Sequence, residues 1–271
     1  MKTRIKMGLA AICFLSLTSC SKYYISTISS TNMPRNEKTG EFQLENDTVK
    51  IFYSFAGESA PVKVTVHNKL SVPLYVDWAK SSLIYQGKAL SYIPQQMAFA
   101  ADLSLISANG SYLSFANGDI KGQLESPKDI AFIPPNTSIE TTTLFLNTPI
   151  FMGFSDSLYK EKEMLNSANG LTKVKSGNFT KSNSPLIFRS YLTLFSKEGD
   201  LVKPFAFDQE FYVSKSVRTY VKPQNLTDYS ENNLNVFYIS KKTKYGKIMG
   251  PVAVIGVIAG AAAIAEVVDQ K

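Results

Sequence analysis

The chain has very little cysteine and histidine. Its 271 residues include two cysteines, Cys13 and Cys20, and one histidine, His67. A disulfide framework needs several cysteine pairs, and a zinc or copper site needs a cluster of cysteine and histidine ligands. We therefore expect no disulfide within one chain, no metal and no cofactor. Stability must come from an ordinary apolar core, which a chain of this length with abundant Phe and Tyr can bury.

Signatures of catalysis are also missing. His67 alternates outward from a valine-rich segment, and no serine or cysteine nucleophile motif accompanies it. Nothing in the spacing of Asp77, Glu140 and Asp208 places two carboxylates at the separation that a glycosidase needs. Gly118 to Gly122 lacks the further glycines of a phosphate-binding loop and predicts a hairpin turn. The sequence therefore predicts a protein that is not an enzyme.

The N-terminus has the organisation of an export signal. Three basic residues precede position 7, an apolar run extends from Met7 to Leu17, and small residues follow in Leu17-Thr18-Ser19-Cys20. This pattern resembles the lipobox of bacterial lipoproteins, in which the cysteine becomes the first mature residue and carries a diacylglyceryl and usually an N-acyl group. The resemblance implies a signal peptide over 1–19 and a lipid anchor on Cys20. Several acyl chains hold a protein on a membrane essentially permanently.

The same resemblance bears on localisation. Cys20 is followed by Ser21 and Lys22 rather than by an aspartate, which in enteric lipoprotein sorting favours the outer membrane. An acidic run of the kind that some lipoproteins use for surface export is also missing. We therefore expect a lipid anchor in the outer membrane of the cell and a domain that faces the periplasm or the surface, with the periplasm favoured.

The charge excess is mild. Removing 1–19 leaves 26 basic residues against 22 acidic ones, a mature net charge of +4. Arginine-rich clusters with interleaved aromatic residues, which are typical of nucleic-acid surfaces, are not seen. We exclude nucleic acid as a partner.

Most of the remaining chain predicts short strands. Segment 20–43 is rich in Ser, Thr and Asn and predicts a flexible tether. In 44–240 apolar residues recur at every second position, as in Val62, Val64 and Val66, which is typical of a half-buried strand. We predict an all-β domain, an antiparallel sandwich. Its expected strands are Val49–Phe55, Val62–His67, Leu74–Trp78, Ser82–Tyr85, Tyr112–Phe115, Ile130–Ile133, Ile139–Leu146, Leu186–Phe195, Glu210–Val217 and Asn235–Ser240.

The region around 147–185 interrupts this pattern and divides the domain into two sub-parts in an alternative interpretation. Ser155 is placed to cap a short helix from Asp156 to about Asn166. Asn166 to Asn183 is rich in Gly, Ser, Asn and Lys and predicts a long polar loop.

Trp78 is the one tryptophan of the chain, and two roles fit it. It is in phase with Leu74 and Val76, which predicts a core anchor. The polar residues around it also allow a sugar-stacking platform, and Trp78 is therefore our candidate binding residue.

Four segments carry a second resemblance: Val64–Asn68, Pro73–Asp77, Ser82–Gly87 and Ile133–Thr137. Their strand and turn patterns resemble exported Ig-like sandwiches, in particular uncharacterised bacterial lipoproteins, and more loosely the late-embryogenesis-abundant type of β-sandwich. The resemblance implies an Ig-like antiparallel β-sandwich that acts as a binding or structural module, and it carries over no catalytic residue.

The C-terminal part, 241–271, combines a basic stretch with a hydrophobic segment. Residues 248–268 are almost entirely apolar and are long enough, as a helix, to cross a bilayer. Gly256 and Gly260 lie four apart and predict a helix-packing face. A helix buried against the domain is the alternative, and the lysines before the segment conflict with the orientation that the export signal implies.

These observations predict a lipid-anchored envelope lipoprotein that acts as a non-catalytic structural or interaction module. Its expected partners are the membrane, through Cys20 and the 248–268 helix, and an envelope protein or glycan. One alternative is a glycan-binding or carbohydrate-active exported protein. Another is a homo-oligomeric assembly that inserts into a membrane through the C-terminal helix.

Overall fold

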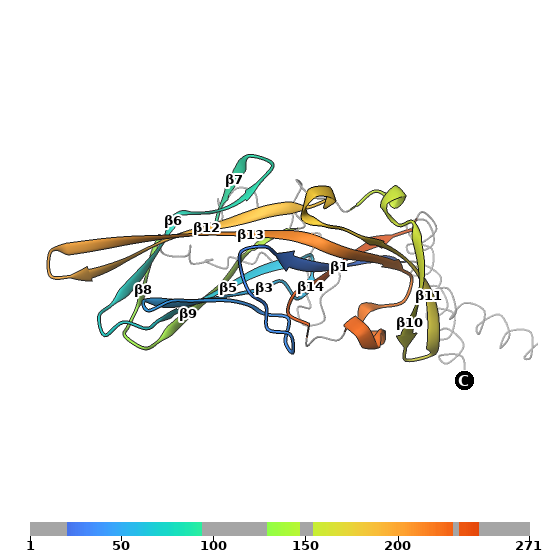
Figure 1. Cartoon of the computed structure of the whole chain (residues 1–271), viewed down its shortest axis with the longest axis horizontal. Helices are drawn as coiled ribbons and strands as arrows, with labels where there is room; N and C mark the ends of the chain where they lie inside the picture. Colours follow the sequence, from blue (N-terminus) through green and yellow to red (C-terminus); the bar gives the residue numbers. More distant parts are fainter. Residues whose placement is uncertain (1–20, 94–128, 147–153, 230–232, 244–271) are drawn as a thin grey trace, which may run out of the picture.

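The computed structural model describes residues 21–93, 129–146, 154–229 and 233–243 (Figure 1). Strands dominate these residues, which confirms the all-β prediction, and they form two sheets. The small sheet has the order β2-β3-β5-β9 and is antiparallel throughout. Its strands are β2 (Phe42–Glu45), β3 (Val49–Ser54), β5 (Pro61–Asn68) and β9 (Ser138–Phe145).

The large sheet follows the path β4-β14-β1-β13-β12-β6-β7, with β8 paired to β6 and the β10–β11 hairpin paired to β13 through β11. Its pairs are antiparallel except for β14 with β4. Its strands are β1 (Ser21–Ser30), β4 (Gly57–Glu58), β6 (Leu74–Tyr85), β7 (Lys88–Ser91), β8 (Ile130–Ile133), β10 (Glu161–Ser167), β11 (Gly170–Asn178), β12 (Ile187–Glu198), β13 (Leu201–Thr219) and β14 (Val236–Lys242). Four short 3-10 helices complete the described chain: η1 (Asp156–Leu158), η2 (Lys181–Asn183), η3 (Pro223–Asn225) and η4 (Thr227–Tyr229).

The apolar core lies between the two sheets. In β5 every second residue is fully buried, as the period-two pattern of Val62, Val64 and Val66 predicts. Aromatic rings fill the centre, where Phe55 and Phe211 pack edge to face with centroids 5.0 Å apart. The arrangement is sandwich-like.

β13 connects the two ends of the molecule. Its 19 residues pair with β12 over the first part, and with β1 on the opposite side from Phe211 onward. At about 3.3 Å per residue the strand is on the order of 60 Å long. Figure 1 shows it running from the β12–β13 hairpin, at the left, to the end that carries β1, β10 and β11.

The prediction of a flexible tether over 20–43 was wrong for its described part. Ser21–Ser30 is strand β1, which lies between β13 and β14. The polar composition is misleading because buried hydroxyl groups of this strand find partners on β13. Ser26 Oγ lies 2.9 Å from Ser216 Oγ, and both side chains are buried.

The helix predicted over 156–166 was also wrong. Ser155 does cap a helical turn, since its side chain accepts a hydrogen bond from the Ser157 N–H, but η1 ends at Leu158. β10 then begins, and the predicted polar loop contains its partner, β11. The hairpin is stabilised because Leu165 and Val174 enter a second apolar cluster together with Ile25 and Val217.

Two predicted strands proved to be one. β6 runs through both Leu74–Trp78 and Ser82–Tyr85, with a register shift against β12 between them. The predicted tight turn after Tyr85 is confirmed: Gln86 and Gly87 both have positive φ, 48° and 74°, and connect β6 to β7.

Several predictions lie outside the described residues. They concern the signal peptide, Cys20, the strand Tyr112–Phe115, the turn at Gly118–Gly122 and the C-terminal segment with Gly256 and Gly260. Among the described parts of the chain, no helix is long and apolar enough to span a membrane.

Candidate functional site

Trp78 lies in the core. It is 5% exposed, and its ring packs against Tyr92 with the centroids 5.6 Å apart. Its backbone N–H donates to the Asp129 carbonyl. A buried indole has no open face for a sugar ring, so the geometry supports the anchor role of Trp78 rather than the platform role.

His67 lies on the outer face of the small sheet, opposite Ser138 of β9. Its Nδ1 atom is 2.9 Å from Ser138 Oγ. Within the described residues, no three His, Cys, Asp or Glu side chains lie close enough together to hold a metal ion. The side-chain partner that the structure gives His67 is therefore the Ser138 hydroxyl.

A polar network crosses the core between the sheets. The hydroxyl groups of Tyr53 and Tyr92 lie 2.7 and 2.8 Å from Ser190 Oγ. Burial raises the pKa of both tyrosines well above the ordinary value. Gln209, opposite Ser190 in the β12–β13 register, buries its Oε1 atom without a hydrogen-bond partner among the described residues. The network is neutral at physiological pH and supplies no activated nucleophile.

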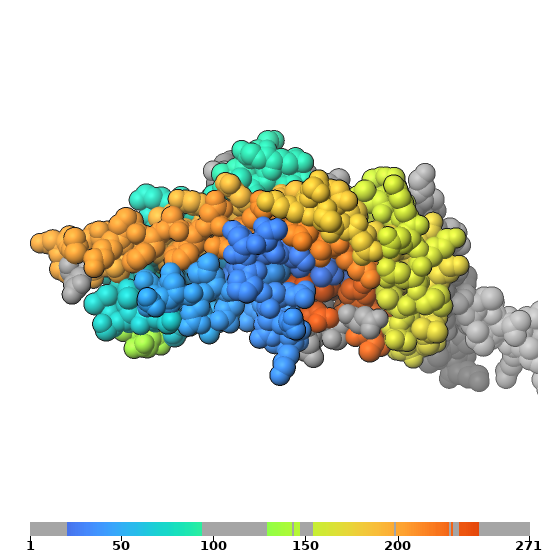
Figure 2. All heavy atoms as spheres, viewed as in Figure 1, coloured from blue at the N-terminus to red at the C-terminus, as the bar shows by residue number. Residues whose placement is uncertain are grey.

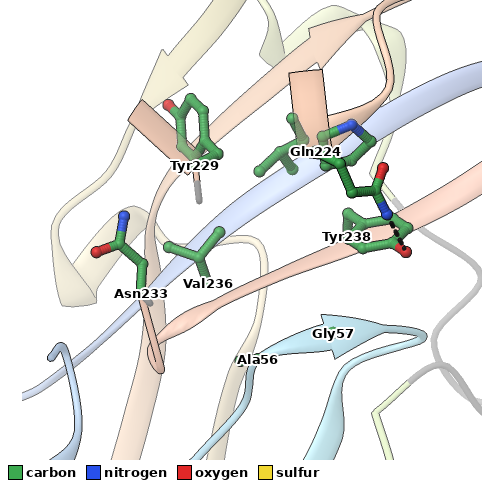
Figure 3. A pocket seen from close by; sticks show the side chains of 9 residues that line it. Ala56, Gly57, Gln224, Tyr229, Asn233, Val236 and Tyr238 are labelled. Atoms are coloured by element: carbon green, nitrogen blue, oxygen red, sulfur yellow. Dashed lines mark hydrogen bonds between the residues drawn. The ribbon is translucent and has the colours of Figure 1, made fainter. Parts of the chain in front are cut away.

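A pocket of about 270 Å³ opens beside β1, β14 and η3 (Figure 3). Its polar edge includes Gln224, whose Nε2 donates to the Tyr238 hydroxyl at 3.2 Å. The described lining residues include no carboxylate, histidine or cysteine, and their polar side chains are two amides and two phenols, which can donate and accept hydrogen bonds to a ligand. The lining consists of Ile25, Ala56, Gly57, Pro223, Gln224, Tyr229, Asn233, Val236 and Tyr238.

A row of aromatic side chains lies on the outer face of the large sheet. Phe195 of β12, Tyr75 of β6 and Phe132 of β8 are direct neighbours in the register, and we call them the outer aromatic row. Tyr75 stacks on Phe195 with centroids 4.8 Å apart and planes 5° from parallel. Phe132 meets Tyr75 edge to face at 5.5 Å. The row faces outward because the flanking residues Leu74 and Leu194 point into the core.

Exposed aliphatic residues extend the row. Phe132 is 54% exposed, Ile130 lies two residues before it on the same face of β8, and Val202 of β13 lies opposite Lys197, which is two residues along β12 from Phe195 and on the same face. Each of these side chains leaves about half of its surface in water. Exposed apolar side chains that gather on one face in this way are typical of a protein interaction site.

Within the described ranges, the edge of the sheet beside these side chains is open. Leu201–Gln209 pairs with β12 on one side, and among the described residues no strand pairs with its other side, because the β1 register begins at Phe211. Glu210 N–H donates to Asn32 Oδ1 on that other side. The backbone N–H groups of the even-numbered β13 residues point to this unpaired side of the strand. Pro204 has no N–H and therefore removes one hydrogen-bond donor from the open edge. A proline at that position limits uncontrolled pairing with other strands.

Comparison with known proteins gives no match: no family model, no curated protein and no solved structure resembles this chain. The class of protein therefore has to be argued from the sequence and the geometry.

The sequence reasoning missed the outer aromatic row. A signal was present, because Tyr75 and Phe132 fall out of phase with their buried neighbours and occupy outward positions of their strands. Their assembly into one row depends on the pairing of three strands that are far apart in the sequence.

Proposed function

We propose that this chain is a non-catalytic lipoprotein of the bacterial cell envelope, anchored in the outer membrane through acylated Cys20, and that it acts as a structural or interaction module. The observation that carries the proposal is the Leu17-Thr18-Ser19-Cys20 pattern behind a basic and apolar leader. The Ig-like type of sandwich belongs to this proposal, because it is supported by the resemblance of the strand and turn motifs.

The position of β1 gives the anchor a structural consequence. Ser21 follows Cys20 directly and already belongs to a strand inside the large sheet. A lipid on Cys20 would therefore hold this end of the sheet at the bilayer without a spacer. The outer aromatic row lies toward the other end of β13, where Pro204 pairs with Phe195. The 14 residue-to-residue steps from Pro204 to Arg218 span about 46 Å along the strand.

This arrangement supports an interaction role. The anchor would hold one end of the domain, and the exposed aromatic and aliphatic side chains would meet a protein partner in the periplasm or at the surface, well away from the lipid. Burial of exposed aromatic rings is a strong source of binding free energy at protein interfaces.

The two alternative functions receive less support. Carbohydrate binding relied on Trp78, which is buried. Membrane insertion of an oligomer depends on Gly256 and Gly260 in 248–268, which lie outside the described residues. Neither alternative is favoured by an observation on the described part of the chain.

Mass spectrometry of the mature N-terminus tests the anchor. We expect a chain that begins at Cys20 and carries acyl groups. A Cys20→Ala variant should lose the modification, whereas Cys13→Ala, in the leader, should keep it. An unmodified chain that begins elsewhere would refute the assignment, and so would a Cys20→Ala protein that stays membrane-bound through its β-domain alone.

Photo-crosslinking in cells tests the partner surface. A photoreactive amino acid at Phe132 should give a discrete protein adduct, which Tyr75→Ser should weaken by disrupting the row. The matched control is Phe52, on the outer face of the small sheet beside Lys50. The same adducts from both positions would show that the aromatic row is not a specific site.

A further inference from the structure

The strand register collects cationic side chains on one face at the Ser21 end of the sheet. Directly opposite residues of neighbouring antiparallel strands project from the same face. Arg218 of β13 lies opposite Tyr24 of β1 on one side and Lys175 of β11 on the other, and Lys175 lies opposite Lys162 of β10. Lys22 lies opposite Lys241 of β14 in the same way. We call this surface the basic face: Lys22, Lys162, Lys173, Lys175, Arg218 and Lys241.

Contacts confirm that Lys22, Arg218 and Lys241 share a face. The Nζ atoms of Lys22 and Lys241 lie 5.9 and 5.4 Å from the centre of the Tyr24 ring. The Asp156 carboxylate binds Arg218 Nη1 at 2.8 Å and Lys22 Nζ at 3.4 Å. It also accepts from the Tyr24 hydroxyl at 3.2 Å. The Arg218 guanidinium holds the pKa of Asp156 below its ordinary value, so this carboxylate is ionised at neutral pH.

One carboxylate does not neutralise the basic face. Asp156 positions Arg218 and Lys22, whose side chains are 17% and 21% exposed. The other four cations are exposed on the strands, and three of them belong to the β10–β11 hairpin. The acidic residues Glu161 and Glu163 alternate with Lys162 and therefore project from the opposite face of the hairpin. The basic face keeps a clear excess of positive charge.

Exposed apolar side chains accompany these cations. Met164 is 56% exposed and lies opposite Lys173, Leu171 is 66% exposed, and Tyr220, just after β13, is 59% exposed. The described residues include seven large exposed hydrophobic side chains, and these three lie at the Ser21 end. Lysine together with exposed leucine, methionine and tyrosine is the composition of surfaces that lie in a membrane interface.

The chain enters and leaves the described domain at this same end. Ser21 lies opposite Lys242 in the register, so the peptide from Cys20 and the peptide toward 244–271 both depart there. The β10–β11 hairpin lies at this end as well (Figure 1), and Figure 2 shows its yellow-green surface at that end of the described domain. An anchor on Cys20 would bring the basic face to the lipid surface.

We propose that the basic face, with Met164, Leu171 and Tyr220 beside it, docks on anionic phospholipid headgroups and fixes the orientation of the domain on the bilayer. The proposal rests on the proposed function in one respect, namely that the anchor on Cys20 delivers this face to a membrane. Each lysine near an anionic leaflet strengthens binding roughly fivefold. With the attraction of several lysines added to an acyl anchor, the β13 axis is held in one orientation and the outer aromatic row is kept away from the lipid.

Hydrogen exchange of the full-length protein tests the docking. We would mix the protein with nanodiscs of phosphatidylcholine alone or of phosphatidylcholine with phosphatidylglycerol. Backbone amides of the β10–β11 hairpin and of Tyr220 should exchange more slowly with the anionic discs, and higher salt should reduce the difference because it screens the charges. Amides of the β12–β13 turn at Gly199 and Asp200 should exchange equally in both.

A pair of matched variants tests the role of charge. Lys173→Glu with Lys175→Glu should abolish the difference between the two discs. Lys88→Glu with Lys203→Glu makes the same change of net charge at exposed positions away from the basic face, and it should leave the difference intact. Equal exchange of the unmodified protein with both discs, or equal effects of the two variants, would overturn the docking proposal.

Mass spectrometry of the same sample separates the two proposals. An acylated Cys20 without any difference between the discs overturns docking and leaves the anchor standing. An unmodified N-terminus with slower exchange of the hairpin on anionic discs supports docking and refutes the anchor. Slower exchange that requires an added envelope protein rather than anionic lipid would reassign the basic face to a protein partner and overturn the lipid assignment.

Discussion

Asn68, the last residue of β5, offers a sharp test of how the sandwich is closed at one end. Its side chain is fully buried. Its Nδ2 atom donates to the carbonyls of Val72, Ile133 and Pro134 at 2.9, 3.1 and 3.1 Å, and its Oδ1 accepts from Leu70 N–H at 2.9 Å. One amide thus joins the turn before β6 to the turn between β8 and β9.

The cost of removing this amide follows from its contacts. The two Nδ2 protons are shared among three carbonyls, so with the Leu70 N–H three protons serve these four contacts. We count them as three hydrogen bonds, each of which contributes about 1 kcal/mol net when intact. Asn68→Ala also leaves buried carbonyls without a donor and opens a small cavity. We expect a loss of about 3 to 5 kcal/mol in the free energy of unfolding. That is a large fraction of the roughly 5 to 15 kcal/mol that stabilises a typical domain.

Asn68→Asp distinguishes lost hydrogen bonds from lost volume, because it keeps the shape and replaces the donor with an oxygen. An ionised carboxylate facing three carbonyls in a buried site is unfavourable, so the pKa of the introduced carboxyl should rise in the folded state. Since the folded pKa then exceeds the unfolded value of about 4, the penalty grows as the pH rises above 4. This variant should be less stable at pH 7 than at pH 4.5.

Urea titration followed by fluorescence measures these effects in the detergent-solubilised full chain, because Trp78 is the one tryptophan and is buried in the core. Asn166→Ala, at an exposed position of β10, is the control and should change stability by less than about 0.5 kcal/mol. An Asn68→Ala protein within about 1 kcal/mol of the parent would refute the reasoning. Equal stability of Asn68→Asp at both pH values would do the same.

Three further predictions use the same preparation. Trp78→Ala should cost about 3 to 5 kcal/mol, measured by circular dichroism, because it removes a large buried ring; unchanged stability with loss of glycan binding would restore the platform role. Gly177→Ala should speed proteolysis within 154–160, because the added Cβ would collide with the Leu158 carbonyl. The control is Gly87→Ala, where the Cβ meets open space and φ is 74°. It should cost only about 1 kcal/mol in the free energy of unfolding and leave 154–160 protected. Buried phenols with raised pKa ionise only after unfolding, so their contribution to stability should be constant below about pH 10 and should decline above it. Absorbance at alkaline pH should show delayed ionisation of three tyrosines. These are Tyr53, Tyr92 and Tyr159.

Local sequence patterns were sufficient for much of the fold. Alternation in β5 predicted which valines are buried, and Gln86-Gly87 predicted the turn after β6, because strand alternation and turn geometry depend on residues that are neighbours in the chain. The all-β class followed from the number of such segments. The lipobox likewise can be read from adjacent residues, and its consequence stays a prediction.

Tertiary structure decided what the local pattern could not. β1 was predicted as a tether because a serine-rich segment looks solvated, yet Ser26 is buried where Ser216 of a distant strand supplies a hydrogen-bond partner. The hairpin of β10 and β11 was predicted as a helix and a loop. A short stretch with Leu165 fits both the helical period of about 3.6 residues and the strand period of about two until its apolar partners are known.

Tertiary structure also decided the two surfaces on which our proposals are based. The outer aromatic row joins strands from three parts of the chain, and the basic face joins cations from five strands. The sequence by itself determined the strand class and the residues available, and it predicts the export signal. Only strand pairing over long separations decided which of those residues lie on one face, because a register is fixed by burial of the whole sheet rather than by any single segment.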